Sequence, residues 1–414
     1  MDVLYADVLL PLPLEGSFTY LVPPVFQPSL AVGCRVLVPL GANKQVTGVV
    51  MGLHGNKPAK GRLKSLIDQL DTEPLLGEET LAFWSWIAAY YCCTLGEVMN
   101  AALPAGLKPS EADADQLDRG TQRLVDVVYP GAEYADSPEL LLEVLPQLTK
   151  AKKQAHLLNV FLTNMLTHSS EEPILQKGIE KRTLLDQSNA TGAQLKALVE
   201  RGLLEIRSIP AEPSMEAQPL QAPALLNEPQ NKALASINDQ FNQYPVCLLH
   251  GYTASGKTEL YIHLIKDCIE QGKQALMLVP EIALTTQLAY RLKRVFGDEL
   301  GIYHSGLNVR ERLDVWRQVG RQNGCKVVLG ARSAVLLPYH NLGLVVVDEE
   351  HDSSYKQQDP APRYHARNAA MVLAARHGAK TLLGTATPSL ESYAHCKAGR
   401  YGLAELFFRY ADAS

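Results

Sequence analysis

The sequence predicts a multidomain α/β protein, and three observations support that fold class. The chain has 414 residues, enough for two or three domains of about 150 residues each. Short β-rich runs separated by Pro and Gly fill residues 1–105, whereas beyond residue 225 apolar runs alternate with amphipathic helical patterns, as in a parallel sheet. Polar or Pro-rich stretches at 106–119 and 209–229 are typical of linkers. We therefore expect domains at 1–105, 120–207 and 225–414.

Composition excludes several classes of protein. With 46% hydrophobic and 20% charged residues, the chain is an ordinary globular sequence, and its net charge of −5 excludes a uniformly basic nucleic-acid coat. No apolar run reaches the roughly 20 residues of a membrane span, and the first residues carry acids where a signal peptide carries bases, so we expect a cytoplasmic protein without membrane contact. Its seven cysteines include no Cys-x-x-Cys pair, which indicates reduced thiols and no zinc site in this chain.

Local patterns predict the elements of the first two regions. In the middle region, Thr191 can cap a helix that reaches Arg201, and Gly202 can end that helix. This pattern, within a mainly helical stretch, is compatible with a helical DNA-binding or protein-binding module. The N-terminal region is predicted to contain strands at 7–10, 34–39 and 46–51, and a helix at 81–91.

A phosphate-binding loop is predicted at residues 251–258, where the sequence is GYTASGKT. An apolar strand at 247–250 precedes it and an amphipathic helix at 259–271 follows, so glycines and the helix N-terminus can wrap backbone N–H groups around phosphates. Lys257 would reach the β- and γ-phosphates of ATP, and the Thr258 hydroxyl would ligate Mg²⁺. The predicted nucleotide-binding residues of the loop are Gly251, Thr253, Ser255, Gly256, Lys257, Thr258 and Glu259.

The sequence DEEH at 348–351 follows an apolar strand at 344–347 and supplies the acids that a phosphate-binding loop requires. Asp348 would hold Mg²⁺ through water, and Glu349 would polarise the attacking water as a general base. Lys257, Asp348 and Glu349 are therefore the predicted catalytic residues.

The DEEH turn resembles that of superfamily 2 helicases, which implies a RecA-like motor lobe. In those helicases a segment like 226–230 reads adenine, which assigns that role to Gln230. Segments 279–287, 304–306 and 330–333 are similar to strand-end motifs that touch the DNA backbone, Arg332 among them. The sequence GTATP at 384–388 resembles the motif that links the ATP site to DNA.

Aromatic and basic residues interleave just past the DEEH turn, a composition that suits base stacking and phosphate contacts on a single strand. An alternative interpretation is that the aromatic residues anchor the loop to the core. The residues predicted to bind DNA here are Tyr355, Lys356, Arg363, Tyr364 and Arg367.

This loop closely resembles the PriA family of replication-restart helicases. Segments 11–20, 33–41 and 90–98 are similar to the family's N-terminal 3′-DNA-binding domain, and residues 120–207 correspond in position to its winged-helix module, in which Lys196 and Arg201 could contact phosphates. The resemblance implies a pocket for a DNA 3′ end at Phe18, Gly41 and Lys64. Thr19 stands where the family's pattern has an aspartate.

The resemblance also implies a function. It predicts an ATP-dependent 3′→5′ DNA helicase of replication restart that recognises stalled or abandoned forks and initiates primosome assembly. The implied partners are forked and single-stranded DNA, primosome proteins and the single-stranded-DNA-binding protein. Two alternatives stay open, namely a non-catalytic module that binds forks and senses nucleotide, and another superfamily 2 DNA translocase.

Two parts of the family's pattern are not recognisable in this sequence. No second α/β run with an arginine-finger motif follows residue 388, and the paired cysteine clusters that would hold the family's zinc ions are missing. We therefore expect an N-terminal portion with the first motor lobe only. Such a chain would bind DNA and ATP without efficient unwinding.

Overall fold

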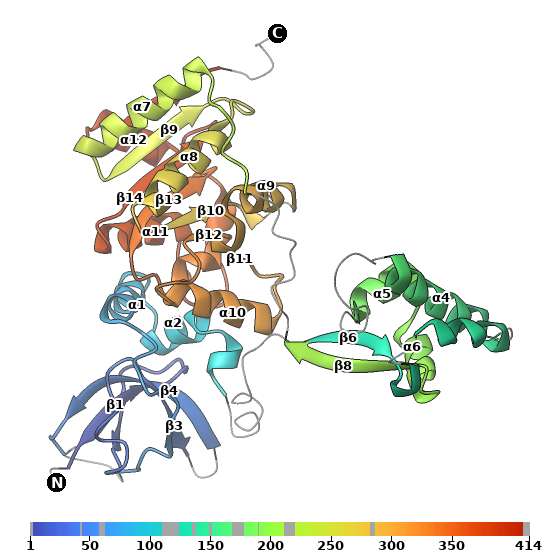
Figure 1. The fold of residues 1–414 in the computed structure, drawn as a ribbon. Helices are drawn as coiled ribbons and strands as arrows, with labels where there is room; N and C mark the ends of the chain where they lie inside the picture. The colour runs from blue at the N-terminus through green and yellow to red at the C-terminus, as the bar shows by residue number, and fades with distance from the viewer. Residues whose placement is uncertain are drawn as a thin grey trace. The chain divides into compact units, whose positions relative to one another are not determined.

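A computed structural model describes the chain at residues 3–41, 44–57, 63–109, 124–134, 138–148, 151–167, 178–188, 190–210, 220–281 and 286–408. Residues 1–117 and 217–414 together form one compact unit, and residues 118–216 form a second (Figure 1). The first linker predicted at 106–119 lies mostly outside the described residues. None of the described helices is long and apolar enough to cross a membrane.

The N-terminal region is a small antiparallel β structure with the strand order β2-β1-β4-β3-β5. A bridge between Leu21 and Ser65 ties β2 to the segment before β5, so the sheet curls back on itself. Alternate residues such as Val8, Tyr20 and Val36 are buried in its interior, as the period of two in a strand requires. The strands are β1 (Tyr5–Leu9), β2 (Phe18–Leu21), β3 (Arg35–Leu40), β4 (Lys44–His54) and β5 (Asp68–Gln69).

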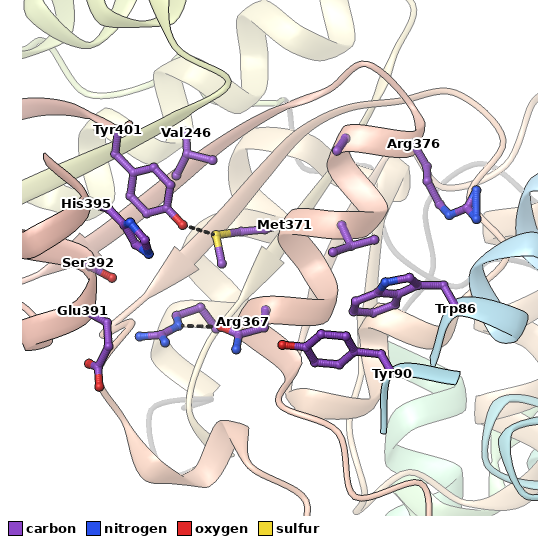
Figure 2. A pocket seen from close by; sticks show the side chains of 13 residues that line it. Trp86, Tyr90, Val246, Arg367, Met371, Arg376, Glu391, Ser392, His395 and Tyr401 are labelled. Carbon is purple, nitrogen blue, oxygen red and sulfur yellow. Dashed lines mark hydrogen bonds between the residues drawn. The ribbon is translucent and has the colours of Figure 1, made fainter. Parts of the chain in front are cut away.

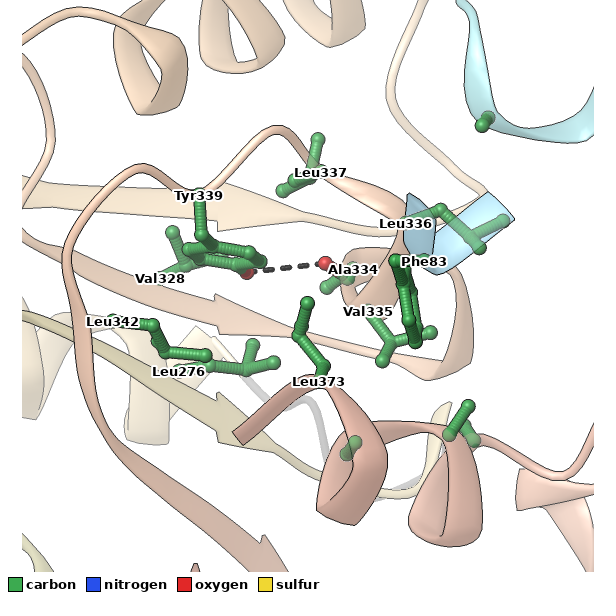
Figure 3. Packing of buried hydrophobic residues seen from close by; sticks show 14 of the residues in the cluster. Phe83, Leu276, Val328, Ala334, Val335, Leu336, Leu337, Tyr339, Leu342 and Leu373 are labelled. Atoms are coloured by element: carbon green, nitrogen blue, oxygen red, sulfur yellow. Dashed lines mark hydrogen bonds between the residues drawn. The ribbon is translucent and has the colours of Figure 1, made fainter. Parts of the chain in front are cut away.

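Two helices, α1 (Glu78–Tyr90) and α2 (Leu95–Ala102), follow the β structure and pack on the C-terminal region. Phe83 of α1 lies beside Val335 and Leu336, more than 240 residues away in sequence, within one buried hydrophobic cluster (Figure 3). The regions predicted as the first and third domains therefore share a hydrophobic core.

The C-terminal region is a seven-stranded parallel sheet with the order β11-β12-β10-β13-β14-β9-β15. Helices cover both of its faces, as the alternation of apolar runs and helical patterns predicts. The loops at the carboxyl ends of the strands carry the candidate site. The strands are β9 (Val246–Gly251), β10 (Gln274–Leu278), β11 (Leu300–Tyr303), β12 (Val327–Gly330), β13 (Leu342–Asp348), β14 (Lys380–Thr385) and β15 (Gly402–Leu406).

Adjacent residues of each strand face opposite layers of helices. Leu249 and Val346 pack in the cluster that contains α7, α8 and α9, whereas Leu248 and Val347 pack with α10, α11 and the N-terminal helices. The helices of this region are α7 (Glu228–Gln243), α8 (Lys257–Glu270), α9 (Thr286–Phe296), α10 (Val309–Gly320), α11 (Ala366–Arg376) and α12 (Leu390–Lys397).

In the unit formed by residues 118–216, the described residues include three α-helices and a three-stranded antiparallel sheet, which pack around their own core. The predicted helix after Thr191 is present as α6, and Gly202 follows its end with a φ of +70°. Lys196, one of two predicted phosphate contacts, forms an exposed ion pair with Glu200. The elements are β6 (Leu124–Pro130), α4 (Lys152–Thr167), β7 (Ile179–Glu180), α5 (Lys181–Ser188), α6 (Gly192–Glu200) and β8 (Leu204–Pro210).

The second predicted linker ends earlier than the sequence indicated. We expected it to reach Pro229, but α7 begins at Glu228 with Asn227 as its cap. Proline lacks an N–H and is favoured in the first turn of a helix, so Pro229 marks a helix start rather than a linker. Residues 211–219 of this stretch lie outside the described residues.

Candidate nucleotide-binding site

The loop between β9 and α8 has the backbone geometry of an anion-binding site. Gly256, the N-cap of α8, adopts φ +84° and ψ 28°, a left-handed conformation that residues with a Cβ rarely adopt. A Cβ at this position would also lie 2.3 Å from the side-chain nitrogen of Gln230. The glycine therefore lets α8 begin close to Gln230, with its first N–H groups unpaired within the helix and available to a phosphate.

A cavity of about 550 Å³ opens at this loop, a size typical of small-molecule sites. It brings together nearly all of the predicted nucleotide and metal ligands, although they come from separate segments of the chain. Gly251 does not line it, but its carbonyl oxygen holds the Lys257 side chain. Its lining residues are Ala224, Leu225, Gln230, Thr253, Ala254, Ser255, Gly256, Lys257, Thr258, Glu259, Arg291, Asp348 and Glu349.

The Lys257 ammonium is buried and held over the loop. It donates to the carbonyl oxygens of Gly251 at 3.0 Å and Tyr252 at 3.2 Å, and it lies 3.9 Å from a carboxylate oxygen of Glu349. Beside it, the buried hydroxyl of Ser255 has no hydrogen-bond partner among the described residues. A positive charge and an unpartnered hydroxyl at a helix N-terminus fit a bound polyphosphate.

Asp348 ends β13 and is held by a residue that the sequence analysis did not select. The hydroxyl of Tyr261, one helical turn after Lys257 on α8, donates to Asp348 at 2.9 Å. Burial raises the pKa of Asp348, and the hydrogen bond from Tyr261 opposes that rise. Asp348 and Thr258 line the same cavity, so carboxylate and hydroxyl oxygens suited to Mg²⁺ are in place. Throughout the described residues, this cavity included, no group of three or more His, Cys, Asp or Glu side chains is placed to hold a metal.

Gln230 lies in the cavity wall and also caps α7. Its side-chain oxygen accepts from the backbone of Asn227 at 3.0 Å, and its amide nitrogen lies 3.5 Å from the Ser255 carbonyl oxygen. This position is next to the loop that would hold the phosphates. The role of Gln230 in reading adenine stays a prediction.

Glu349 is linked through a chain of polar contacts to the segment after β14. Its carboxylate lies 3.4 Å from the Thr385 hydroxyl, and that hydroxyl lies 2.8 Å from His351 Nδ1. The other ring nitrogen of His351 reaches the Thr387 hydroxyl at 3.3 Å. β13 and β14 are neighbours, with Asp348 opposite Gly384, so the catalytic turn and the GTATP segment lie side by side. The DEEH and GTATP motifs, some 35 residues apart in sequence, are thereby connected by hydrogen bonds.

Glu350 is fully buried and forms a second link between the same segments. It accepts from the Arg367 guanidinium at 2.6 Å, from the Ser389 backbone N–H at 2.6 Å and from the Ser392 hydroxyl at 2.9 Å. Burial works to raise the pKa of Glu350, but these hydrogen bonds and the arginine charge outweigh it and hold the pKa below its usual value. One nitrogen of the Arg367 guanidinium is engaged by this pair, and DNA contact by Arg367 stays a prediction.

The aromatic residues of the following loop are also buried in this structure, and their stacking on bases stays a prediction. Tyr355 is 1% exposed and donates to the Asp348 carbonyl oxygen at 2.6 Å. Tyr364 is 0% exposed and donates to the Arg332 carbonyl oxygen at 3.3 Å. Each ring gains apolar burial while its hydroxyl finds a partner, which favours burial of tyrosine over exposure. Burial and these hydrogen bonds favour the alternative interpretation, that the two tyrosines anchor the loop to the core.

Basic residues of the loop are partly occupied by its own backbone. Arg332 donates to the carbonyl oxygens of Ser354 at 3.0 Å and Lys356 at 3.1 Å, and the Lys356 ammonium donates to the Arg363 carbonyl oxygen. Arg363 is exposed, with Asp359 at 3.2 Å. DNA contact by Arg332, Lys356 and Arg363 stays a prediction.

Comparison with known proteins agrees with this architecture region by region. Residues 7–104 match the 3′DNA-binding domain of PriA, residues 132–209 match the winged helix domain of PriA helicase from Bacteroidota, and residues 227–395 match the DEAD/DEAH box helicase family. The chain is 32% identical over 453 residues to replication restart protein PriA of Bacillus subtilis, covering 96% of this chain and 54% of the relative. It is 37% identical over 404 residues to the Haemophilus influenzae protein of the same name, and the match covers 95% of this chain and 50% of that relative.

The chain belongs to the PriA family. It spans about half the length of the curated relatives that it matches. The predicted fold class, with a 3′-DNA-binding domain, a winged-helix domain and a helicase lobe built on a parallel sheet, is confirmed. Among solved structures, the Pyrococcus furiosus Hef helicase domain is 16% identical over 42% of this chain and 38% of its own, with a TM-score of 0.32, a likeness too distant to bear on the assignment.

Within the PriA 3′-DNA-binding domain, two of the three predicted pocket residues meet. The Lys64 ammonium donates to the carbonyl oxygen of Gly41, where φ is +65°, and Phe18 begins β2. Thr19 donates to Asp7 at 2.7 Å across the β1–β2 pair. A carboxylate therefore lies one hydrogen bond from the position where the PriA pattern has an aspartate. Only the strand register could have pointed to Asp7.

A second cavity, of about 770 Å³, lies between α1, α11 and α12 (Figure 2). Trp86 and Tyr90 form one side, with their stacked ring centroids 5.0 Å apart. Met371 and Tyr401 lie opposite, and the Tyr401 hydroxyl lies 3.5 Å from the Met371 sulfur. Arg367 also lines this cavity, so its buried pair with Glu350 connects the cavity wall to the DEEH turn. The sequence motifs described above do not point to this cavity.

Replacing Tyr261 by Phe tests the support of Asp348. Removal of the hydroxyl takes away a hydrogen bond that lowers the pKa of Asp348, so that pKa rises further. Mg²⁺-dependent binding of a fluorescent ATP analogue, which requires the carboxylate, will then be lost at a higher pH than in the unaltered chain as pH is lowered. Tyr339→Phe, which removes a buried hydroxyl bonded to Ala334 on the other face of the sheet, is the control. Identical pH profiles for both variants would contradict the assignment.

Replacing Arg367 by Gln tests the buried ion pair. Glu350 would keep a buried charge without its counter-ion, which costs about 3–5 kcal/mol of unfolding free energy. Because the pKa of Glu350 is lowered on folding, this contribution is present above the ordinary glutamate pKa and declines as pH falls through the folded value. Urea titrations at neutral and acidic pH measure both effects. Arg363→Gln, which breaks an exposed pair, should cost less than about 1 kcal/mol, and equal losses for the two variants would refute the account.

Proposed function

We propose that this chain carries the DNA-engaging and ATP-binding parts of an ATP-dependent DNA helicase of replication restart, with 3′→5′ polarity. The observation that carries the proposal is the single cavity that joins Lys257 and Thr258 to Asp348 and Glu349. The family match and its 3′-DNA-binding domain support DNA as the substrate. Replication forks lie in the bacterial cytoplasm, which is therefore the proposed location.

The residues of the cavity have distinct roles in the proposed reaction. Lys257 and the first N–H groups of α8 hold the phosphates, and Thr258 and Asp348 provide oxygen ligands for Mg²⁺. Mg²⁺, when bound, would neutralise charge that develops on the phosphates. Glu349 accepts a proton from the attacking water as general base, and its link through Thr385 connects this step to the segment after β14.

The N-terminal domain would select the DNA. Lys64 over Gly41 places a positive charge at a backbone turn, which suits a phosphate or the terminal hydroxyl of a strand. We propose that this domain recognises the 3′ end at stalled or abandoned forks. Primosome proteins and the single-stranded-DNA-binding protein are the proposed protein partners, by resemblance to the family.

The affinity of the chain for forked DNA tests the proposed 3′-end pocket. Forks whose leading strand ends in a free 3′-hydroxyl should bind more tightly than forks whose 3′ end is blocked by a bulky, uncharged group. Lys64→Ala should weaken binding to the free-ended fork by about tenfold, because a charged hydrogen bond is lost. Lys57→Ala, an exposed lysine of the same domain, should not. A chain that binds blocked and free forks equally would show that the pocket is wrongly assigned.

Nucleotide binding and turnover test the motor assignment. The 414-residue polypeptide should bind a fluorescent ATP analogue with Mg²⁺, and Lys257→Ala should abolish that binding. Superfamily 2 motors hydrolyse ATP between two lobes, and loss of the arginine finger costs about 10³–10⁵ in rate. We therefore propose that these residues alone bind forks without efficient unwinding. DNA-stimulated hydrolysis at a full helicase rate would overturn this proposal, and absence of nucleotide binding would favour a module that binds forks only.

A further inference from the structure

Tyr91 joins the N-terminal region to the loop that follows the DEEH turn. It lies directly after α1, and the Lys356 ammonium lies 5.4 Å from the centre of its ring. The Tyr91 hydroxyl also lies 3.5 Å from the carbonyl oxygen of His365, 274 residues away in sequence. The end of α1 is therefore in direct contact with a loop in which DNA-binding residues are predicted.

Lys356 and His365 form the neck of this loop, because they face each other in an antiparallel bridge. Tyr91 contacts both of them, so it contacts both strands of the neck. The neck is also anchored on its other side, since Tyr355, the residue before Lys356, donates to the Asp348 carbonyl oxygen at 2.6 Å. The neck consequently lies between the end of α1 and the end of β13.

The ring of Tyr91 is held in place by its own region of the chain. It packs edge-to-face with the rings of Tyr90 and Trp86, with centroid distances of 4.9 and 6.0 Å. The next residue, Cys92, adopts a φ of +51°, which turns the chain sharply after the tyrosine. A ring that is held in this way offers a preformed face to a cation.

Lys356 is the cation on that face, and it is only half-buried. Its ammonium also donates to the carbonyl oxygen of Arg363. Both of these partners, a ring and a carbonyl oxygen of the described residues, are neutral. Hydrogen bonds between two ionised groups are roughly twice as strong as those between neutral groups, so a DNA phosphate is the stronger partner for this ammonium. A phosphate would therefore compete with the Tyr91 ring for Lys356.

We propose that Tyr91 withholds Lys356 from DNA, as an autoinhibitory contact that single-stranded DNA displaces when it binds the loop. The inference rests on the proposed binding of DNA and on the predicted DNA contact of Lys356, and it adds a contact that opposes them. Because the ammonium leaves the ring face before it reaches a phosphate, the contact weakens DNA binding by the strength of one cation–π interaction, about 2- to 5-fold in affinity. The N-terminal region thereby controls how readily the loop engages DNA.

Binding of single-stranded DNA by the 414-residue chain tests this inference without reliance on ATP turnover. The probe is a labelled oligothymidylate whose 3′ end carries a bulky, uncharged group, which removes the contribution of the proposed 3′-end pocket. Tyr91→Leu takes away the ring face and should bind the probe about 2- to 5-fold more tightly, with an unchanged dependence on salt. Tyr91→Met is a second variant with the same expectation. Tyr91→Phe keeps the ring and should bind like the unaltered chain.

Tyr393→Leu is the matched control. Lys397 lies 5.2 Å from the ring centre of Tyr393, so the substitution removes a similar cation–π contact, but both residues belong to α12. This variant should bind the probe like the unaltered chain. Tighter binding in Tyr393→Leu as well would show that the effect does not come from the neck of the loop, and would overturn the inference.

A comparison with Lys356→Gln assigns the effect to one cation. This variant should bind the probe more weakly, and the slope of log affinity against log salt should become shallower by about 0.7, the value for one phosphate contact on a single strand. In the Lys356→Gln background, Tyr91→Leu should have no further effect. Tighter binding that persists without Lys356, or binding that is weakened or unchanged in both Tyr91→Leu and Tyr91→Met, would overturn the inference.

The same variants separate this inference from the proposal on which it rests. If Lys356→Gln weakens binding and the Tyr91 variants do not change it, the inference fails while the DNA contact of Lys356 stands. If Lys356→Gln binds the probe like the unaltered chain, that contact and the inference fail together.

Discussion

The buried ion pair between Glu350 and Arg367 is the interaction on which the catalytic region depends. Glu350 is the residue after the proposed general base, and its carboxylate holds α11 through Arg367 and the start of α12 through Ser389 and Ser392. A charge that is wholly buried requires such a set of donors. The DEEH turn is consequently fixed by contacts to Arg367, Ser389 and Ser392, which are not among the residues that line the nucleotide cavity.

Two tyrosine hydroxyls from different segments also hold Asp348 by hydrogen bonds. Tyr261 of α8 holds Asp348 from the side of the phosphate-binding loop, and Tyr355 holds the Asp348 backbone from the loop that follows. Glu349 itself has a positive φ of +44°, a conformation that costs energy and persists only where surrounding contacts impose it. The neighbouring pair at Glu350 provides contacts of that kind. The geometry of the reaction centre is thus a property of the packed core.

Sequence reasoning located most of the nucleotide site because its chemistry is encoded in short, contiguous motifs next to recognisable strands. Features that depend on tertiary packing could not be predicted in the same way. The burial of Tyr355 and Tyr364 could not be read from their spacing, since an aromatic–basic cluster suits both a stacking surface and an anchored loop. Tyr261 and Asp7 were missed for a related reason, because each acts through a partner brought near only by the sheet.

The most direct test of the central role of the Glu350–Arg367 pair is a double-mutant cycle with Glu350→Gln and Arg367→Gln, followed by urea unfolding. The account predicts that each single variant loses several kcal/mol, whereas the double variant loses clearly less than their sum, with a coupling of about 1.5–3 kcal/mol. It further predicts that binding of an ATP analogue weakens in both single variants and recovers in part in the double variant. Additive losses, with nucleotide binding unchanged throughout, would contradict it.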